Sequence, residues 1–229
     1  MTARPANVIG SMLVSSRSLG EYRRMFGLTD ADLSGTILDC PGGCAGFAAE
    51  ATEFGARVVA VDPEYATDTA TMREQGLRTL QRGMAYHLEH PDEYVWTYFT
   101  DVEQYQAERT QALERFAADR AAHPERYVTA LLPDLPFQDR EFDLALTSHL
   151  LFSYLDRLDE DFHLAAIVEL TRVARQARIF PLAPMGSQSY DGLPKFLERL
   201  AAAGIDAEVK AVDYEFQRGC NEMLVVSQG

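Results

Sequence analysis

A glycine-rich turn and an acidic residue follow two short apolar runs, and these residues are the ones best suited to hold a ligand. The run Thr36–Asp39 leads into Cys40-Pro41-Gly42-Gly43, and the run Arg57–Val61 ends at Asp62. Small residues let a ligand approach the backbone closely, and the start of the following helix offers free N–H groups. A carboxylate at Asp62 can accept both hydroxyls of a ribose. The combination predicts a nucleoside site; the alternative is a tight turn whose glycines serve only packing.

The residue types in this turn narrow the class of nucleoside. A dinucleotide site requires glycine where Pro41 stands, because the pattern G-x-G-x-x-G seats a pyrophosphate. The sequence contains no G-x-x-x-x-G-K-[ST], which argues against an NTPase. Asp39 would repel a pyrophosphate and attract a cationic or zwitterionic group such as an α-amino group. A nicotinamide-dependent enzyme is therefore the weaker hypothesis.

The chain resembles the class I S-adenosylmethionine (SAM)-dependent methyltransferases in four segments, which are Ile37–Gly43, Val59–Asp62, Leu135–Leu146 and Glu169–Val173. The resemblance implies a Rossmann-like fold with SAM as the cofactor. It implies that the methionine part of SAM contacts Asp39 and the Gly42–Gly43 backbone, and that Asp62 binds the ribose. The other cofactor-binding residues expected from it are Cys40, Pro41, Pro63, Asp134, Leu135 and Ser148.

Three features depart from the family pattern. Only Gly43 of the family's glycine triplet is in register, because Pro41 and Ala45 take the other two positions. Leu131 stands where an acidic residue often precedes Leu-Pro-Phe, so Asp134 becomes the candidate for recognising the adenine. The Pro-Gly-Gly turn usual before strand five is also replaced. These departures leave the fold assignment intact.

His149 is the predicted catalytic residue. It follows Thr147-Ser148 at the end of the apolar run Phe142–Leu146, where the reactive methyl group lies in a fold of this type. Methyl transfer is an in-line displacement, for which the protein aligns donor and acceptor and can remove a proton. Imidazole has the pKa range for that work. The alternative is a histidine that packs under the loop or caps the next helix.

Aromatic residues near these segments form the predicted acceptor site. Their faces favour a cation such as a sulfonium. The substrate-binding residues predicted are Tyr65, Trp96, Phe152, Tyr154 and Tyr190. Packing in the core or in a lid is the alternative role for each of them.

A parallel sheet is needed to bring these residues together. Apolar runs that alternate with helical segments predict one doubly wound, mostly parallel, seven-stranded α/β domain over residues 1–229. Its last strands, Ala207–Val212 and Met223–Val226, are expected to form an antiparallel hairpin. The stretch 66–126 is predicted to be a helical insertion after strand two, serving as a lid, a buttress or a dimer surface. The helices expected are Leu19–Phe26 within an N-terminal helical segment over 1–34, then Ala45–Phe54, Ala66–Glu89, Val102–Ala122, Glu160–Ala174 and Lys195–Ala203.

The charge and the cysteine content limit the partners and the cellular location that we expect. Lys+Arg is 21 against Asp+Glu at 35, a formal net charge of −14. A surface that acidic repels phosphate backbones and anionic lipid, so neither nucleic acid nor a membrane is expected as a partner. It favours a neutral or cationic small-molecule acceptor. The three cysteines form no CxxC and the N-terminus does not read as a signal peptide, so we expect a cytoplasmic protein, monomeric or homodimeric.

The leading hypothesis is a SAM-dependent methyltransferase that acts on a small molecule. One alternative keeps the fold and SAM but changes the chemistry, for example when SAM's own amine closes a ring and releases methylthioadenosine. A second alternative is a nucleoside-binding module without catalysis. The acceptor and the atom that is methylated stay open at this point.

Overall fold

Seven strands form one mixed sheet in the computed structural model, which describes residues 13–186 and 188–229. Their order is β3-β2-β1-β4-β5-β7-β6, with β1 to β5 parallel and β7 antiparallel to both of its neighbours. The strands are β1 (Thr36–Asp39), β2 (Arg57–Val61), β3 (Tyr127–Val128), β4 (Phe142–Ser148), β5 (Ala174–Phe180), β6 (Ile205–Ala211) and β7 (Glu222–Gln228). This is a doubly wound, mostly parallel seven-stranded α/β sheet that ends in an antiparallel pair, so the predicted fold class is confirmed.

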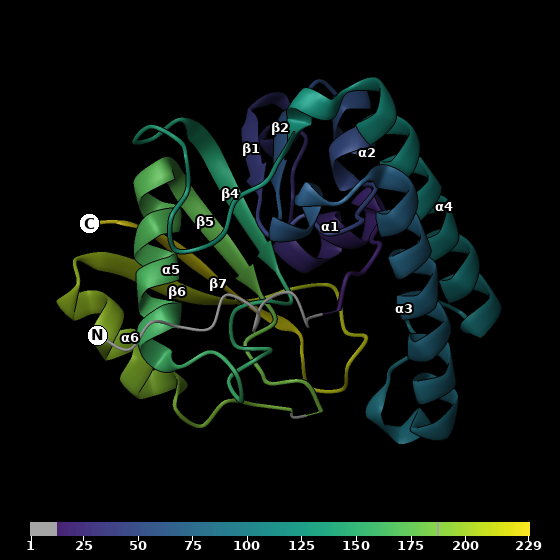
Figure 1. Cartoon of the computed structure of the whole chain (residues 1–229). Helices are drawn as coiled ribbons and strands as arrows, with labels where there is room; N and C mark the ends of the chain where they lie inside the picture. Colours follow the sequence, from purple (N-terminus) through teal and green to yellow (C-terminus); the bar gives the residue numbers. More distant parts are fainter. Residues whose placement is uncertain (1–12, 187) are drawn as a thin grey trace.

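Helices cover both faces of the sheet, as Figure 1 shows. One face carries α1 (Leu19–Phe26) and α2 (Phe47–Glu53), with the hairpin of α3 (Thr69–Glu89) and α4 (Val102–Ala122) packed outside α2. The other face carries α5 (Glu160–Val173) and α6 (Leu193–Ala202). A hydrophobic core therefore lies on each side of the sheet, and residues of β1 and β4 contribute to both.

The boundaries of the elements differ from the predicted ones by a few residues, and most differences have a local cause. Helix α2 begins after Gly46, and α3 begins after Asp68, whose side chain accepts a hydrogen bond from the Thr71 N–H. Strand β5 begins at Ala174, so α5 ends one residue early. The two residues of β3 are too few to produce a pattern. Residues 1–12 of the predicted N-terminal segment lie outside the described residues.

Helix α1 has strong local signals at both ends. Ser18 and Glu21 form a reciprocal capping box at its start, and Gly27 ends it in the left-handed conformation at φ 57°. The cap orients the first turn of α1, so that Glu21 and Tyr22 are buried beneath the sheet's carboxyl edge. These side chains belong to the site described below.

Glycines allow close packing within the α3–α4 hairpin and between α4 and the start of α2. A Cβ at Gly46 would stand 2.8 Å from the Ala112 carbonyl oxygen, and one at Gly76 would stand 2.7 Å from Leu113 Cδ1. The missing side chains let the backbone of α4 approach the glycine-rich turn.

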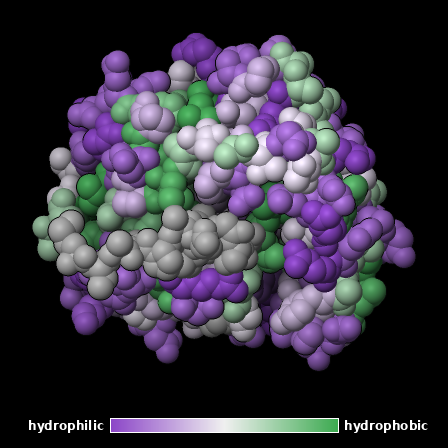
Figure 2. Space-filling view, in the orientation of Figure 1, coloured by the Kyte–Doolittle hydropathy of each residue, from purple (hydrophilic) through white to green (hydrophobic). Residues whose placement is uncertain are grey.

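Polar side chains cover most of the face seen in Figure 2. Within the described residues no helix combines the length and apolar character that crossing a bilayer requires.

Gly46→Ala tests this close approach. The new methyl group would meet the backbone of α4, which cannot move cheaply, so we expect the free energy of unfolding to fall by about 1–3 kcal/mol in urea titrations. Gly83→Ala is the matched control, because a Cβ at Gly83 meets its nearest atom, the Tyr105 hydroxyl oxygen, at 3.5 Å. That helical substitution should be neutral or raise stability by up to about 1 kcal/mol. Equal effects of the two variants would contradict the packing account.

Candidate active site

A cavity of about 570 Å³ lies at the carboxyl edge of the sheet. Its volume is in the range of small-molecule and cofactor sites. The glycine-rich turn, the ends of β2 and β4, helices α3 and α4, the segment before α1 and the loop between β6 and β7 all contribute to its lining. The fold thus gathers segments from distant parts of the sequence around one cavity.

The amides of the glycine-rich turn are all used inside the protein. The N–H groups of residues 42–46 donate to acceptors 2.9–3.1 Å away. The acceptors are the Val61 carbonyl, the Asp62 carboxylate, and the carbonyls of Ser15, Gly42 and Arg17. A bound phosphate needs free amides of this kind. The turn therefore presents a small, close-packed surface with no amide free to bind a phosphate.

Asp62 closes this turn and also lines the cavity. Its Oδ2 accepts from the Gly43 N–H at 2.9 Å and its Oδ1 from the Glu64 N–H at 2.9 Å. Each carboxylate oxygen has a second lone pair, so both can still accept a ligand hydroxyl. Burial raises the pKa of Asp62 to about 6, against the two backbone hydrogen bonds that lower it. The carboxylate is therefore mostly ionised at neutral pH.

Asp39 is buried beside the cavity and does not line it. The Tyr22 hydroxyl, which does line the cavity, donates to the Asp39 carboxyl at 3.0 and 3.2 Å. Burial, together with the charge of Asp62, raises the pKa of Asp39 to about 8. Asp39 thus holds a proton over most of the neutral range, and Tyr22 is the group it presents to a ligand.

His149 lies at the end of β4, with its ring edge toward Phe180. Its backbone has φ 53°, and its N–H donates to the Phe180 carbonyl at 2.7 Å. Ser148 Oγ lies 2.9 Å from Nδ1 of the ring, and Nε2 has no hydrogen-bond partner among the described residues. Burial and the charges of Arg17 and Arg109 hold the pKa of His149 well below its usual range. The imidazole is therefore neutral.

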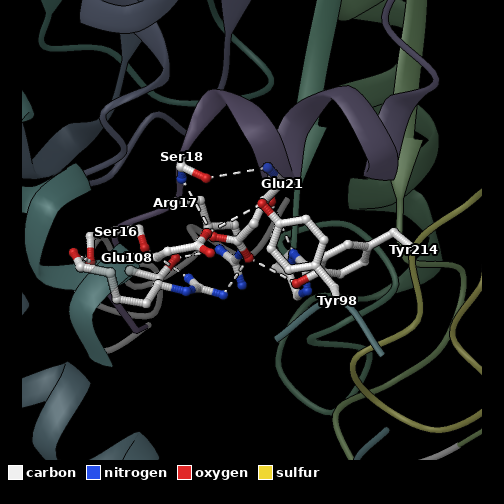
Figure 3. A network of polar contacts seen from close by, with 11 residues as sticks. Ser16, Arg17, Ser18, Glu21, Tyr98, Glu108 and Tyr214 are labelled. Carbon is white, nitrogen blue, oxygen red and sulfur yellow. Dashed lines mark hydrogen bonds and ion pairs between the residues drawn. The ribbon is translucent and has the colours of Figure 1, made fainter. Parts of the chain in front are cut away.

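A buried ion pair joins α1 to α4 beside the cavity (Figure 3). Arg109 and Glu21 are 2.7 Å apart, with side chains 5% and 0% exposed. The Tyr214 hydroxyl also donates to Glu21, at 2.8 Å. Arg109 donates to the Ser16 carbonyl at 2.9 Å, and the Ser16 hydroxyl donates back to the Arg109 carbonyl at 2.8 Å. This network holds the segment before α1 in place next to the glycine-rich turn.

The structure brings half of the sequence-predicted site residues into the lining of the cavity. These are Pro41, Gly42, Gly43, Asp62, Pro63, Ser148, His149 and Tyr154. The others lie outside the lining, and they are Asp39, Cys40, Tyr65, Trp96, Asp134, Leu135, Phe152 and Tyr190.

Each residue outside the lining has another environment. Cys40, Leu135 and Phe152 are buried in the core beneath α5, and Tyr190 donates its hydroxyl to Glu160 at 2.5 Å. Asp134 is exposed in the connection between β3 and β4.

Tyr65 and Trp96 are placed directly behind the lining. The Tyr65 hydroxyl donates to the Gly43 carbonyl at 3.0 Å, and this hydrogen bond stabilises the turn. Trp96 packs edge-on against Phe216 and Tyr105, which are lining residues.

Sequence reasoning missed the charged and aromatic residues that come from the flanking segments. They are Arg17, Tyr22, His87, Tyr94, Tyr105, Arg109, Tyr214 and Phe216. Arg109 carried a usable signal, because it shares the apolar face of its helix with Leu113 and Phe116. Arg17 precedes a helix and carried none.

Comparison with known proteins found one relative in sequence and several likenesses in structure. The chain is 30% identical over 212 residues to the uncharacterized protein MJ0045 of Methanocaldococcus jannaschii, covering 92% of this chain and 93% of that protein. No protein-family model matches the sequence.

Two solved structures illustrate the likenesses in structure. The 1,6-didemethyltoxoflavin-N1-methyltransferase of Burkholderia thailandensis, with bound 1,6-didemethyltoxoflavin and S-adenosylhomocysteine, is 14% identical with a TM-score of 0.46, over 85% of this chain and 71% of that one. A TehB-like SAM-dependent methyltransferase of Corynebacterium glutamicum is 16% identical with a TM-score of 0.45, over 87% of each chain.

Glu21→Gln tests the buried ion pair. The variant leaves Arg109 charged and uncompensated out of water, so we expect the free energy of unfolding to fall by about 3–5 kcal/mol in denaturant titrations. Glu53→Gln is the control, because Glu53 pairs with Arg115 on the surface, where such a pair contributes about 1 kcal/mol or less. A loss at Glu21 as small as that at Glu53 would show that the pair contributes little.

Asp39→Asn tests the proton on Asp39. In the folded chain this carboxyl binds a proton up to a pKa of about 8, against 3.8 in the unfolded chain, so the free energy of unfolding falls as the pH rises between these values. The asparagine variant should lose stability less steeply with pH, by up to about 1.4 kcal/mol per pH unit. Urea titrations across this range measure the slope, with exposed Asp30→Asn as control. Parallel curves for Asp39→Asn and wild type would mean that Asp39 is ionised throughout.

Proposed function

We propose that this chain, which belongs to the same family as the MJ0045 protein of Methanocaldococcus jannaschii, is a SAM-dependent methyltransferase with a small-molecule acceptor. The observation that carries the proposal is the pairing of two features in one cavity. A carboxylate that can accept ribose hydroxyls lies at the end of β2, and the adjoining glycine-rich turn has no free amide for a phosphate. A nucleoside ligand without phosphates fits both features.

The residues of the turn fit SAM. A Cβ on Gly42 would stand 2.5 Å from the Tyr65 hydroxyl, and Gly43 has φ 52°, so the turn requires glycine at both positions to keep this conformation. Asp62 would hold the ribose hydroxyls. Tyr22, backed by Asp39, would face the amino-acid end of the cofactor. Bound SAM supplies an electrophilic methyl group for an in-line displacement.

His149 is the residue best placed to act on the acceptor. It lies where β4 ends, and the hydrogen bond between its ring and Ser148 orients it. Because the imidazole is neutral, Nε2 has a lone pair that can accept a hydrogen bond from an acceptor hydroxyl or amine. It would orient that group toward the methyl donor and receive its proton as the new bond forms.

The walls of the cavity support a small acceptor. Helices α3 and α4 and the β6–β7 loop line the same cavity as His149, and its volume of about 570 Å³ suits a small molecule. The net charge of −14 also disfavours a polyanion. The hairpin of α3 and α4 would act as a cap that excludes water from the acceptor.

Asp62→Asn tests the site by calorimetric titration with S-adenosylhomocysteine, with NAD as the comparison ligand. We expect wild type to bind S-adenosylhomocysteine and not NAD, and the variant to bind about 10- to 100-fold more weakly, because it loses a charged hydrogen-bond acceptor. Asp156→Asn, an exposed change outside the lining, should bind as wild type does. Circular dichroism establishes that the variants fold.

The same titration has a pH dependence that belongs to Asp62. Its pKa of about 6 means that the carboxylate becomes protonated as the pH falls from about 7 to about 5, and an acceptor is lost. Wild-type affinity should fall over this range by at most about tenfold per pH unit, and Asp62→Asn should show a flatter profile. Unchanged affinity in Asp62→Asn would remove Asp62 from the site, and failure of wild type to bind S-adenosylhomocysteine would refute the cofactor.

A further inference from the structure

Three buried nitrogen atoms around the cavity have no hydrogen-bond partner among the described residues. They are Nε of Arg17, Nε of Arg109 and Nδ1 of His87, and all three residues line the cavity. Buried polar groups in native proteins almost always have partners, and each unsatisfied group calls for an explanation. A bound ligand that offers acceptor atoms at this end of the cavity would satisfy the two arginine N–H groups.

The charge at this end is positive. Glu21 compensates Arg109, but no carboxylate among the described residues forms an ion pair with Arg17, whose guanidinium donates to the Ser15 hydroxyl. Burial and the nearby charge of Arg109 lower the pKa of Arg17, against the charge of Glu21, which raises it. Glu21 acts on Arg109 as well, with which it forms the ion pair. Two buried guanidinium groups therefore share one carboxylate.

The other charged residues of the lining are further along the cavity. Asp62 and Glu64 lie at the end of β2, and Arg82 and Glu93 lie on and just after α3. Arg17 acts on the pKa of His149 and also on those of Tyr22 and Asp39, whereas the charges that chiefly act on Asp62 are those of Glu64 and Arg120. The Arg17 guanidinium thus lies toward His149 and Tyr22, away from the ribose site at Asp62.

Aromatic rings form the wall next to these arginines. Tyr105 and Phe216 lie nearly parallel, with ring centroids 5.3 Å apart, and Tyr94 packs against Phe216 at 5.0 Å. Arg109 lies over the Tyr105 ring at 5.1 Å. Such a wall favours a flat apolar ligand, because aromatic rings stack in offset or edge-on arrangements.

We propose that the acceptor is a planar aromatic carboxylate whose carboxylate binds Arg17 and Arg109 and whose ring lies against Tyr94, Tyr105 and Phe216. The planar guanidinium fork matches a carboxylate in a bidentate pair. The proposal rests on the proposed function, because it assigns this end of the cavity to the acceptor. It replaces the neutral or cationic acceptor expected from the net charge of the chain.

The test uses 2-naphthoate and its uncharged analogue 2-naphthamide as probes, titrated into protein saturated with S-adenosylhomocysteine. The cofactor product occupies its own site, so its amino-acid carboxylate cannot account for binding of the probe. We expect wild type to bind naphthoate about tenfold or more tightly than naphthamide. Arg17→Gln should remove this preference, and Arg17→Lys should keep part of it, because it retains the charge without the fork.

Arg78→Gln is the matched control, because Arg78 is an exposed arginine of α3 outside the lining. It should leave the preference for naphthoate unchanged. Circular dichroism and the affinity for S-adenosylhomocysteine establish that each variant is folded.

The outcomes distinguish this proposal from the proposed function. Suppose that Arg17→Gln binds S-adenosylhomocysteine about tenfold more weakly than wild type does, and that wild type does not prefer naphthoate over naphthamide. The Arg17 guanidinium then binds the carboxylate of the cofactor, and the acceptor proposal is overturned. Equal affinity of wild type for the two probes also overturns the acceptor proposal, but it leaves the assignment of the cofactor unchanged. Failure of wild type to bind S-adenosylhomocysteine overturns the proposed function and, with it, the assignment of this end to an acceptor.

Discussion

The buried ion pair between Glu21 and Arg109 is the interaction on which the site depends. Each side chain is almost wholly removed from water, so either charge left without the other would strongly destabilise the fold. The pair also recruits Ser16 and Tyr214, which brings together the segment before α1, helix α4 and the loop between β6 and β7. The cavity exists where these segments meet the carboxyl edge of the sheet, so its shape follows from satisfying two buried charges.

The glycine-rich turn imposes a second constraint, because its backbone is already satisfied. Asp62 and the carbonyls of Ser15 and Arg17 take up the amides that would otherwise bind a phosphate. The turn can thus contact a ligand closely without attracting an anion. The carboxylate of Asp62 accepts hydrogen bonds from the turn and also faces the cavity, where it can accept ribose hydroxyls. The same group therefore stabilises the local fold and favours a nucleoside ligand without phosphates.

The net charge of the whole chain does not predict the local charge around Arg17 and Arg109 in the cavity. The net charge of −14 describes mainly side chains in water, where salt screens them over about 10 Å. Arg17 and Arg109 lie in a region of low dielectric, where charges act strongly over short distances. A strongly acidic protein can therefore present a basic subsite, and the charge of the surface does not report on the acceptor.

The sequence by itself determined the doubly wound fold, the turn at Gly42–Gly43, and the positions of Asp62 and His149 at strand ends. These features follow from local periodicity and from the rule that parallel strands place their carboxyl ends at one edge. Only the tertiary structure decided which flanking side chains reach the cavity, so Arg17 lines it while Phe152, predicted to do so, is buried beneath α5. The physical reason is that the direction of a side chain outside the sheet depends on how helices and loops pack, and no local pattern encodes that packing.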